Sequence, residues 1–108
     1  MKKLLALGLT ACCLTAIDVQ AQPGAPAADI AAGQQRAAAC FACHNANGIA
    51  QIPGTPHLAG QERGYLEKAL RAYRDASTRQ EPTMNAMAKP LSDQDIANIA
   101  AYFSSLPR

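Results

Sequence analysis

The chain has 108 residues, and its ten Lys and Arg against eight Asp and Glu give a formal net charge of +2 at pH 7. This length allows one ordinary domain at most, and so small an excess of positive charge is not the electrostatic footprint of a nucleic-acid-binding protein. Because aromatic residues make up only 5% of the chain and Trp is absent, we expect something other than aromatic side chains to fill the core of so small a domain.

The first 21 residues have the pattern of a secretory signal peptide. Two lysines follow the first residue, an apolar run extends from Leu4 to Ile17, and a Val-Gln-Ala triplet ends at Ala21. The run is short for a membrane span, which needs roughly 20 apolar residues. We therefore predict cleavage after Ala21, export to the periplasm of a bacterium, and no stable membrane insertion after cleavage.

Two other interpretations of this segment stay open. The segment could remain uncleaved as an anchor, or Leu9 to Cys12 could be a lipobox in which Cys12 becomes the lipidated first residue of the mature chain. Only eight residues separate Lys3 from Cys12, which is short for that route. Cleavage after Ala21 would leave Cys40 and Cys43 as the remaining cysteines, and no conventional disulfide framework can be built from them.

Residues 22–28 form a Pro- and Ala-rich lead-in that we expect to be disordered, and residues 29–108 form the domain. Asp29 is a good helix N-cap. The sequence that follows is rich in alanine, which favours helix. We therefore predict a helix from Ile30 to Cys40 that ends at a turn formed by the sequence CFACH.

Residues 45–60 are rich in Gly and Pro and are predicted to be a loop. Residues 61–76 are predicted to be a helix, because apolar side chains recur on one face at Tyr65, Leu66, Ala69, Leu70 and Tyr73. Residues 77–90 have Pro at both flanks and are predicted to be irregular. The basic residues of this region are expected to form a solvated face: Arg63, Lys68, Arg71, Arg74 and Arg79.

The last helix has a clear start. Ser92, followed three residues later by Asp95, approximates a capping box. The apolar stripe consists of Ile96, Ile99, Ala100 and Phe103. Gly33 and the small residues near it would let Tyr102 or Phe103 of this helix approach closely. Since no segment alternates with a period of two, we expect no sheet.

The sequence CFACH places two thiols and an imidazole within five residues. A thioredoxin-like redox pair would need a βαβ setting, and no strand is expected. A zinc site needs four ligands, with His57 as the fourth, and the adjacent side chains of Cys43 and His44 diverge on a helical turn. Cysteines three apart on such a turn face the same side, can form thioethers with two haem vinyl groups, and place His44 against the iron. The pattern CxxCH is a signature of covalent haem attachment, so we predict one haem c with its iron.

A sixth ligand for the iron could come from Met84, Met87 or His57. A thioether raises the reduction potential relative to a second imidazole. Both methionines lie in the segment predicted to be irregular, which could cross the open face of a haem. His57 is expected to be a loop histidine at the surface. Physical reasoning favours a methionine but does not separate Met84 from Met87.

Five segments in order resemble a class I c-type cytochrome: CFACH, PHLAG, YLEKALRAYR, MNAM and LSDQDIANIAAYFSSL. The resemblance is to single-haem cytochrome c553 and to one haem domain of cytochrome c4, and it covers roughly residues 29 to 106. The resemblance implies an all-α class I fold, with three to four helices wrapped around one covalently bound haem. It also implies that Cys40 and Cys43 form the thioethers and that His44 is the proximal iron ligand.

Further site residues follow from the same resemblance. In the family, the proline carbonyl of a P-x-L-x-G segment accepts a hydrogen bond from the proximal imidazole, and Pro56 holds that place, with Leu58 and Gly60 completing the segment. The distal methionine lies seven residues before the leucine that opens the last helix. That spacing from Leu91 selects Met84, with Met87 as the alternative.

The chain departs from the family pattern in several respects. Ala76 stands near a position that is often glycine, the loop to Met84 is short, and the chain has one CxxCH where cytochrome c4 has two haems. Because of Ala76, the end of the middle helix is expected to differ from the family's.

The function expected from these residues is one-electron transport without enzymatic activity, with the iron cycling between Fe(II) and Fe(III) under His/Met ligation. We expect a monomer that meets redox proteins transiently. The alternatives are a haem-based sensor or gas-binding protein and a haem subunit of a larger oxidoreductase. Arg79 is a candidate partner of a haem propionate. The expected pocket residues are Ile49, Ile52, Leu58, Leu66, Leu70, Ile99 and Phe103.

Overall fold

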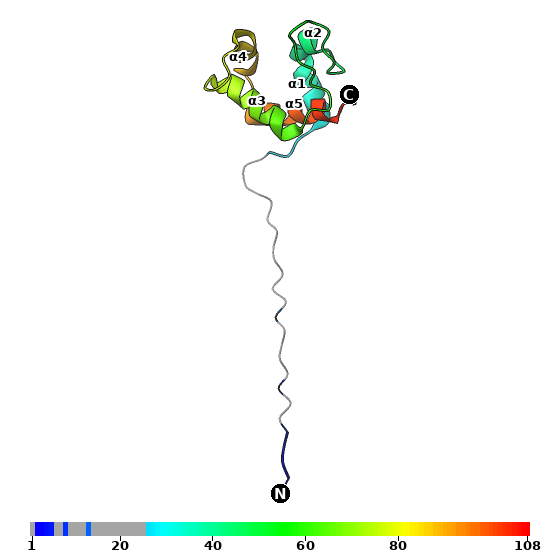
Figure 1. Ribbon diagram of the computed structural model, residues 1–108, viewed down its shortest axis with the longest axis vertical. Coiled ribbons are helices and arrows are strands. Elements are labelled where there is room, and N and C mark those ends of the chain that lie inside the picture. Colours follow the sequence, from blue (N-terminus) through cyan, green and yellow to red (C-terminus); the bar gives the residue numbers. More distant parts are fainter. Residues whose placement is uncertain (1, 6–7, 9–12, 14–25) are drawn as a thin grey trace.

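The computed structural model describes residues 2–5, 8, 13 and 26–108 (Figure 1). The predicted cleavage site at Ala21, the lipobox at Cys12 and the first part of the lead-in lie outside the described residues. Nowhere in the described part does a helix combine the length and the apolar character needed to span a bilayer.

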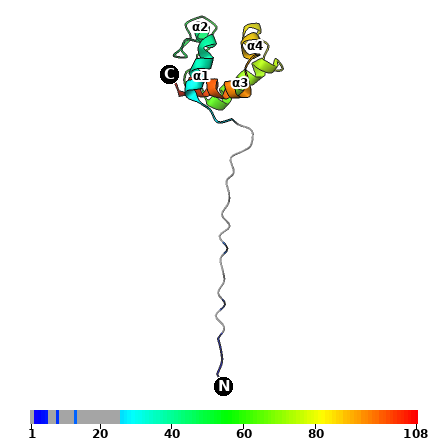
Figure 2. The ribbon, with the colours of Figure 1, turned by 180° about the vertical axis from the view of Figure 1, so that it is seen from behind.

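All regular structure in the described part of the chain is helical, which confirms the all-α fold class. The elements in chain order are α1 (Ile30–Arg36), the 3₁₀ turn η1 (Ala37–Cys40), α2 (Phe41–His44), α3 (Arg63–Asp75), α4 (Pro82–Ala88) and α5 (Asp93–Ser105). Figures 1 and 2 show α3 and α5 as a base from which two arms rise, one made of α1 and α2 and the other of α4. The helix α5 packs against both α1 and α3, and α4 packs against α3.

The first arm begins as predicted but ends later. The Asp29 carboxylate accepts a hydrogen bond from the Ala32 amide at 3.0 Å and caps α1. The predicted end of this helix at Cys40 is wrong, because η1 and α2 continue the helical path through His44. The path stops at Asn45, whose φ of 61° does not continue a right-handed helix. Asparagine is among the non-glycine residues that most often adopt a positive φ.

The helix α3 lies within the predicted range 61–76. The Glu62 carboxylate caps its first turn by accepting from the amides of Gly64 at 2.8 Å and Tyr65 at 2.7 Å. These two hydrogen bonds lower the pKa of Glu62. The helix ends at Ala76, which adopts the left-handed conformation with φ 52°. An alanine therefore occupies a backbone conformation that helices commonly give to glycine.

The prediction that residues 77–90 are irregular is wrong, because Pro82–Ala88 form α4. Proline suits the first position of a helix, where an amide hydrogen would have no partner within the helix. The Glu81 carboxylate caps α4 by accepting from the Met84 amide at 2.7 Å. Both candidate methionines consequently lie on a helix and not on an irregular strand.

The capping box at the start of α5 is confirmed. The Ser92 hydroxyl accepts from the Asp95 amide, and the Asp95 carboxylate accepts from the Ser92 amide, both at 3.0 Å. The second bond is the main cause of a lowered pKa of Asp95. Beyond this cap α5 forms the centre of the core, with Ile96 and Phe103 fully buried.

The helices α1 and α5 approach closely at Gly33. A Cβ atom on Gly33 would overlap the backbone carbonyl group of Asn98 and lie 3.1 Å from the Cβ of Tyr102. The predicted close approach is therefore present, and its partners are Asn98 and Tyr102. The Asn98 side chain also accepts from the Asp29 amide at 2.9 Å, so α5 binds the first turn of α1 through polar groups as well.

The end of the lead-in is attached to the domain. The Ala27 carbonyl accepts from the Gln94 side chain at 2.7 Å, and the Pro26 carbonyl lies 3.4 Å from a guanidinium nitrogen of Arg63. The expected disorder of residues 22–28 therefore does not extend to these last residues of the segment.

Candidate functional site

The two cysteines lie three residues apart on one helical path. Cys40 is the last residue of η1 and is half-buried, and Cys43 lies in α2 and is exposed. Both are free thiols. Burial raises the pKa of the Cys40 thiol, and the positive charge of Arg36 opposes this rise. The arrangement keeps both sulfur atoms available for bonds to a group outside the chain.

His44 is held by a hydrogen bond from its ring. Its Nδ1 lies 2.9 Å from the carbonyl oxygen of Pro56, and the residue is only 7% exposed. A carbonyl oxygen can only accept, so Nδ1 carries the proton and Nε2 has the free lone pair. Within the described residues Nε2 makes no hydrogen bond. His44 is thus a buried imidazole with a fixed ring orientation and one nitrogen that makes no hydrogen bond to a described residue.

The loop that carries Pro56 closes on Gly48. The Gly48 carbonyl accepts from the amides of Leu58 at 2.8 Å and Ala59 at 3.1 Å. A Cβ on Gly48 would lie 2.8 Å from the Ala59 nitrogen, so the backbone approach requires glycine there. Leu58 is half-buried and packs against the core. This contact fixes the part of the loop that holds the Pro56 carbonyl.

His57 is exposed, but it has a structural contact. Its Nδ1 accepts a hydrogen bond from the Ala50 amide at 2.9 Å, a bond between two parts of the loop that the sequence did not indicate. It also borders a surface hollow together with Ile49 and Arg108. His57 therefore helps to hold the loop in place.

Two alternatives for the CFACH segment find no support in the structure. No three or more His, Cys, Asp or Glu side chains in the described ranges are grouped closely enough to hold a metal ion. Cys40, Cys43, His44 and His57 thus do not assemble a zinc site. The thioredoxin-like alternative required a strand, and residues 26–108 contain helices, turns and loops only.

The candidate methionines lie on α4, in the arm opposite α2 (Figure 1). Met84 is half-buried and Met87 is 38% exposed. The Asn85 side chain donates to the carbonyl oxygens of Tyr73 at 2.8 Å and Arg79 at 2.9 Å. These two bonds hold α4 against the end of α3, so the methionines stand on an anchored helix.

Most of the expected pocket residues contribute to the interior. Leu66, Ile99 and Phe103 belong to the buried core, and Leu58 and Leu70 pack against it. Ile52 is 48% exposed and does not belong to the core cluster, so its place in the pocket stays a prediction.

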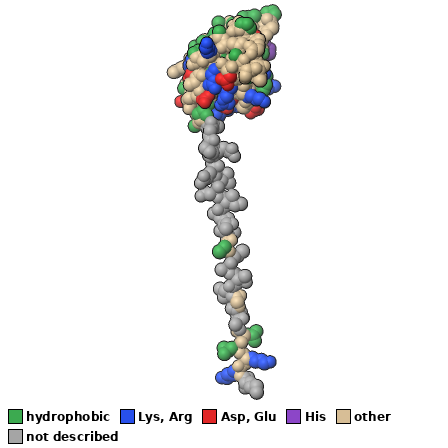
Figure 3. Space-filling view, turned by 90° about the vertical axis from the view of Figure 1, so that its left-hand side faces the viewer, with side chains coloured by type: hydrophobic (Ala, Val, Ile, Leu, Met, Phe, Trp, Pro, Cys, Tyr) green, Lys and Arg blue, Asp and Glu red, His purple; other side chains and the backbone are tan. Residues whose placement is uncertain are grey.

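The basic residues near α3 are mostly paired and do not form a uniformly solvated face. Glu67 lies 2.7 Å from Arg63 and 3.8 Å from Arg71. Arg74 lies 2.8 Å from Asp93 and holds the pKa of that carboxyl below its ordinary value. Figure 3 shows acidic and basic side chains next to one another on the side of the domain that faces the viewer.

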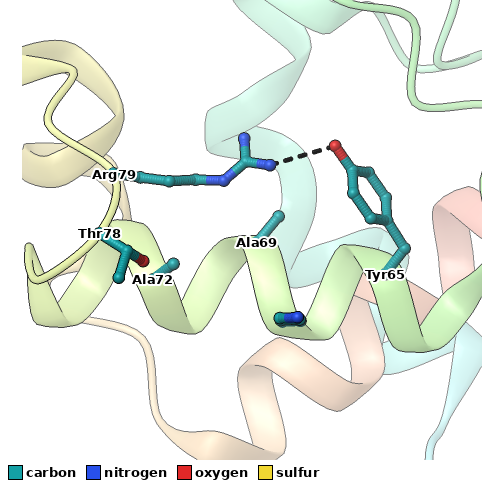
Figure 4. Close-up of a pocket in the computed structure, with 6 residues that line it drawn as sticks. Tyr65, Ala69, Ala72, Thr78 and Arg79 are labelled. Atoms are coloured by element: carbon teal, nitrogen blue, oxygen red, sulfur yellow. Dashed lines mark hydrogen bonds between the residues drawn. The ribbon is translucent and has the colours of Figure 1, made fainter.

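A cavity lies over α3, next to the loop that leads to α4 (Figure 4). Its lining comprises Tyr65, Lys68, Ala69, Ala72, Thr78 and Arg79. The Arg79 side chain extends across the cavity toward Tyr65 (Figure 4). The sequence singled out Arg79 but gave no sign that two tyrosines of α3 would hold its guanidinium group.

Comparisons with known proteins agree on one family. The family model described as cytochrome c matches residues 30–107. The chain is 46% identical over 81 residues to cytochrome c-554(548) of Halomonas halodenitrificans, an alignment covering 73% of this chain and 98% of that protein. It is 48% identical over 79 residues to cytochrome c4 of Pseudomonas aeruginosa. That alignment covers 73% of this chain and 39% of that protein.

A solved structure shows the same fold. The chain superposes on reduced recombinant cytochrome c4 from Pseudomonas stutzeri with a TM-score of 0.71 and 43% identity, covering 75% of this chain and 47% of that one. The chain thus spans nearly all of one relative but less than half of each cytochrome c4 compared.

Proposed function

Because the chain belongs to the cytochrome c family, we propose that it is a periplasmic one-electron carrier with His44 and Met84 as its axial iron ligands. The observation that carries the proposal is the ring geometry of His44, with Nδ1 on the Pro56 carbonyl at 2.9 Å and Nε2 free. A histidine that ligates a metal commonly donates its other ring N–H to such an acceptor.

The prosthetic group of this family, covalent haem c, fits the residues present. Two free thiols lie on one helical path, the imidazole beside Cys43 has an available nitrogen, and a thioether side chain comes from the opposite arm. When bound, the haem supplies an iron that changes between Fe(II) and Fe(III) by one electron. Cys40 and Cys43 would hold it through thioethers.

The contribution of His44 is a fixed orientation and a fixed tautomer. The Pro56 carbonyl prevents rotation of the ring and makes Nε2 a stronger donor to a metal. Leu58 and the closure of the loop on Gly48 hold that carbonyl in place. Burial of the ring keeps water away from the ligand, so the ligand need not rearrange when the charge of the site changes.

Two features favour Met84 over Met87. Met84 is the more buried of the two, and its amide is fixed by the Glu81 carboxylate in the first turn of α4. A ligand on an anchored turn is positioned with less loss of conformational entropy on binding. His44 and Met84 would both hold the iron, which would leave no position on it for a substrate, and for this reason we propose no catalytic activity.

The expected partners are redox proteins that dock briefly through a small interface. The ion pairs of Glu67 and Arg74 neutralise much of the α3 surface, so electrostatic steering should be modest. We propose that the mature protein is a monomer that begins after Ala21. The mass of the chain isolated from the periplasmic fraction tests the cleavage site, because lipidation at Cys12 would give a longer and lipid-modified chain.

The ligation is tested by absorption spectra of the haem-loaded protein in both oxidation states. Oxidised wild type should show the weak red charge-transfer band of ferric iron bound to thioether sulfur. Met84→Ala should lose this band, and Met87→Ala, the matched control, should keep it. The reverse pattern would move the ligand to Met87. Absence of the band in wild type, together with carbon monoxide binding at neutral pH, would favour the sensor alternative.

A further inference from the structure

The side chain of His57 closes the segment of residues 51–56. The Ala50 amide donates to Nδ1 of His57 at 2.9 Å, so the residues on the two sides of the segment are joined directly. Inside these six described residues, one backbone hydrogen bond is present, from the Thr55 amide to the Ile52 carbonyl at 3.1 Å. Two of the six are prolines, which have no amide hydrogen to donate. The position of the segment therefore depends on the contact that His57 makes.

His57 is directly linked to the acceptor of the His44 ring. The Pro56 carbonyl and the His57 amide belong to one planar peptide unit, and that carbonyl lies 2.9 Å from Nδ1 of His44. Ala50 is buried whereas His57 is exposed, so the bond between them attaches this peptide unit to an interior point of the loop. A change at the His57 side chain is thus transmitted to the contact of His44 through a single peptide unit.

The bond to Ala50 requires a neutral His57. A backbone amide can only donate, so Nδ1 of His57 must have a free lone pair. In a protonated imidazole both ring nitrogens are donors, and neither can accept. Histidine is the side chain that ordinarily changes its charge between about pH 5 and pH 8. Because His57 is exposed, protons reach it from solvent, and the bond is available only in its unprotonated state.

One other charged side chain borders the same surface hollow as His57. The rest of the lining comprises Ile49, Ala59, Gln61 and Arg108. The Arg108 guanidinium group donates to the Gly60 carbonyl at 2.8 and 3.1 Å, and an arginine keeps its charge throughout this pH range. The chain contains two histidines, and the other, His44, is the proposed iron ligand. His57 is therefore the side chain at this hollow that responds to pH near neutrality.

We propose that His57 is a pH-sensitive positioning residue for His44; this inference rests on the proposed function. Neutral His57, held by the Ala50 amide, fixes the Pro56 carbonyl on Nδ1 of His44. When His57 takes up a proton, the bond to Ala50 is lost and the Pro56 carbonyl is held less firmly. The hydrogen bond to the His44 ring weakens as a result.

A consequence follows for the reduction potential. The hydrogen bond from Nδ1 of His44 makes the imidazole a stronger donor to a metal, and a stronger donor favours Fe(III) over Fe(II). The midpoint potential should therefore rise as the pH falls and His57 becomes protonated. A positive charge on His57 would by itself raise the potential as well, so the test must separate the charge from the lost hydrogen bond.

The test is the midpoint potential of the haem-loaded protein between about pH 5 and pH 8, for wild type, His57→Asn and His57→Ala. The Asn oxygen can take the place of Nδ1 and accept from the Ala50 amide without titrating. His57→Asn should keep the potential that wild type has at high pH and lose the rise toward acid pH. His57→Ala should lose the rise as well, but its potential should lie above that of His57→Asn at every pH.

Two results would overturn the proposal. A rise toward acid pH in His57→Asn equal to that of wild type would assign the titration to another group. Equal potentials in His57→Asn and His57→Ala would mean that His57 acts through its charge alone. If His57→Ala fails to fold, the comparison of wild type with His57→Asn still tests the pH response, because the conservative variant retains the acceptor.

NMR spectra of the reduced, haem-loaded protein give a second readout. The Ala50 amide resonance should shift with pH in wild type and stay constant in His57→Asn. The Nδ1 proton of His44 should exchange with water roughly fivefold faster in His57→Ala than in His57→Asn, as expected for the loss of one hydrogen bond. Equal exchange rates would also count against the proposal. Failure of the proposed function is separate, since wild type would then lack the thioether band and a reversible one-electron couple.

Discussion

The Nδ1 atom of His44 and the carbonyl oxygen of Pro56 lie 2.9 Å apart, although the two residues are twelve positions apart in the chain. The first belongs to the arm of α1 and α2, and the second to a loop without regular structure. The contact depends on the way this loop closes at Gly48, where one carbonyl accepts two amides. The orientation of the proposed iron ligand consequently depends on a glycine of the loop, which holds the Pro56 carbonyl in place.

Gly48→Ala should destabilise the protein and disturb His44. Gly48 has φ 71°, and an added Cβ would also lie 2.8 Å from the Ala59 nitrogen. The control is Gly54→Ala, where φ is 85° and the added Cβ meets no atom within 4 Å. Gly54→Ala should cost about 1–2 kcal/mol for its backbone conformation alone. Gly48→Ala should cost about 1–3 kcal/mol more through overpacking.

Urea unfolding of the haem-loaded protein measures this difference, and the midpoint potential reports on His44. Only Gly48→Ala should change the potential, because only that substitution displaces the Pro56 segment. Equal unfolding free energies and equal potentials in the two variants would contradict this account of the loop.

Ala76→Gly should stabilise the protein. Ala76 ends α3 with φ 52° and ψ 30°, a conformation that costs an alanine about 1 kcal/mol relative to glycine. The greater freedom of glycine in the unfolded chain offsets part of this gain. We expect an increase of up to about 1 kcal/mol in the free energy of unfolding. Ala31→Gly, at an exposed position inside α1, should change stability in the opposite direction.

Several elements could be predicted because their signals are local. Asp29 and Ser92 cap helices through side chains that reach amides within three residues, and the apolar stripe of α5 has helical spacing. The helix α4 was missed because a proline-flanked segment usually indicates a loop, and its start depends on a single carboxylate from Glu81. Local patterns also could not show that the helical path continues through His44.

The candidate site likewise has residues that the sequence predicts and contacts that it does not. Cys40, Cys43 and His44 are recognisable because their chemistry requires a fixed spacing along the chain. The contacts of Arg79 with Tyr65 and Tyr73 span 14 and 6 residues. They depend on how the loop after α3 folds back over that helix. Family spacing alone distinguished Met84 from Met87 in the sequence, and the structure adds a difference in burial.

The protein should lose stability in acid through its capping carboxylates. Hydrogen bonds from the amides of Gly64 and Tyr65 lower the pKa of Glu62, and a bond from the Ser92 amide lowers that of Asp95. A carboxyl whose pKa is lower in the folded state stabilises the fold above its unfolded pKa. That stabilisation is lost as the pH falls through the folded pKa. Stability should therefore begin to fall below the ordinary values of 4.5 for Glu and 3.8 for Asp.

Glu62→Gln isolates one part of this effect. Glutamine can still accept from the amides of α3 but does not titrate, so the decline of stability between pH 5 and pH 3 should be shallower than in wild type. Urea unfolding at a series of pH values gives both curves. Superimposable curves would mean that Glu62 does not contribute to the acid sensitivity.

Gly33→Ala should separate the first arm from α5. An added Cβ would overlap the Asn98 carbonyl group, 2.5 Å from its carbon atom. Backbone atoms cannot move aside as a flexible side chain can, so α1 must shift away from α5. We expect the free energy of unfolding to fall by about 3 kcal/mol or more. We also expect a lower yield of haem-loaded protein, because α1 continues into the residues that carry Cys40 and His44.

The control is Gln34→Ala, at an exposed position on the same helix. It should change the free energy of unfolding by no more than about 0.5 kcal/mol and should leave the yield of haem-loaded protein normal. If Gly33→Ala were as stable as Gln34→Ala, the packing of α1 on α5 would not be what positions the thiols and His44 on the domain.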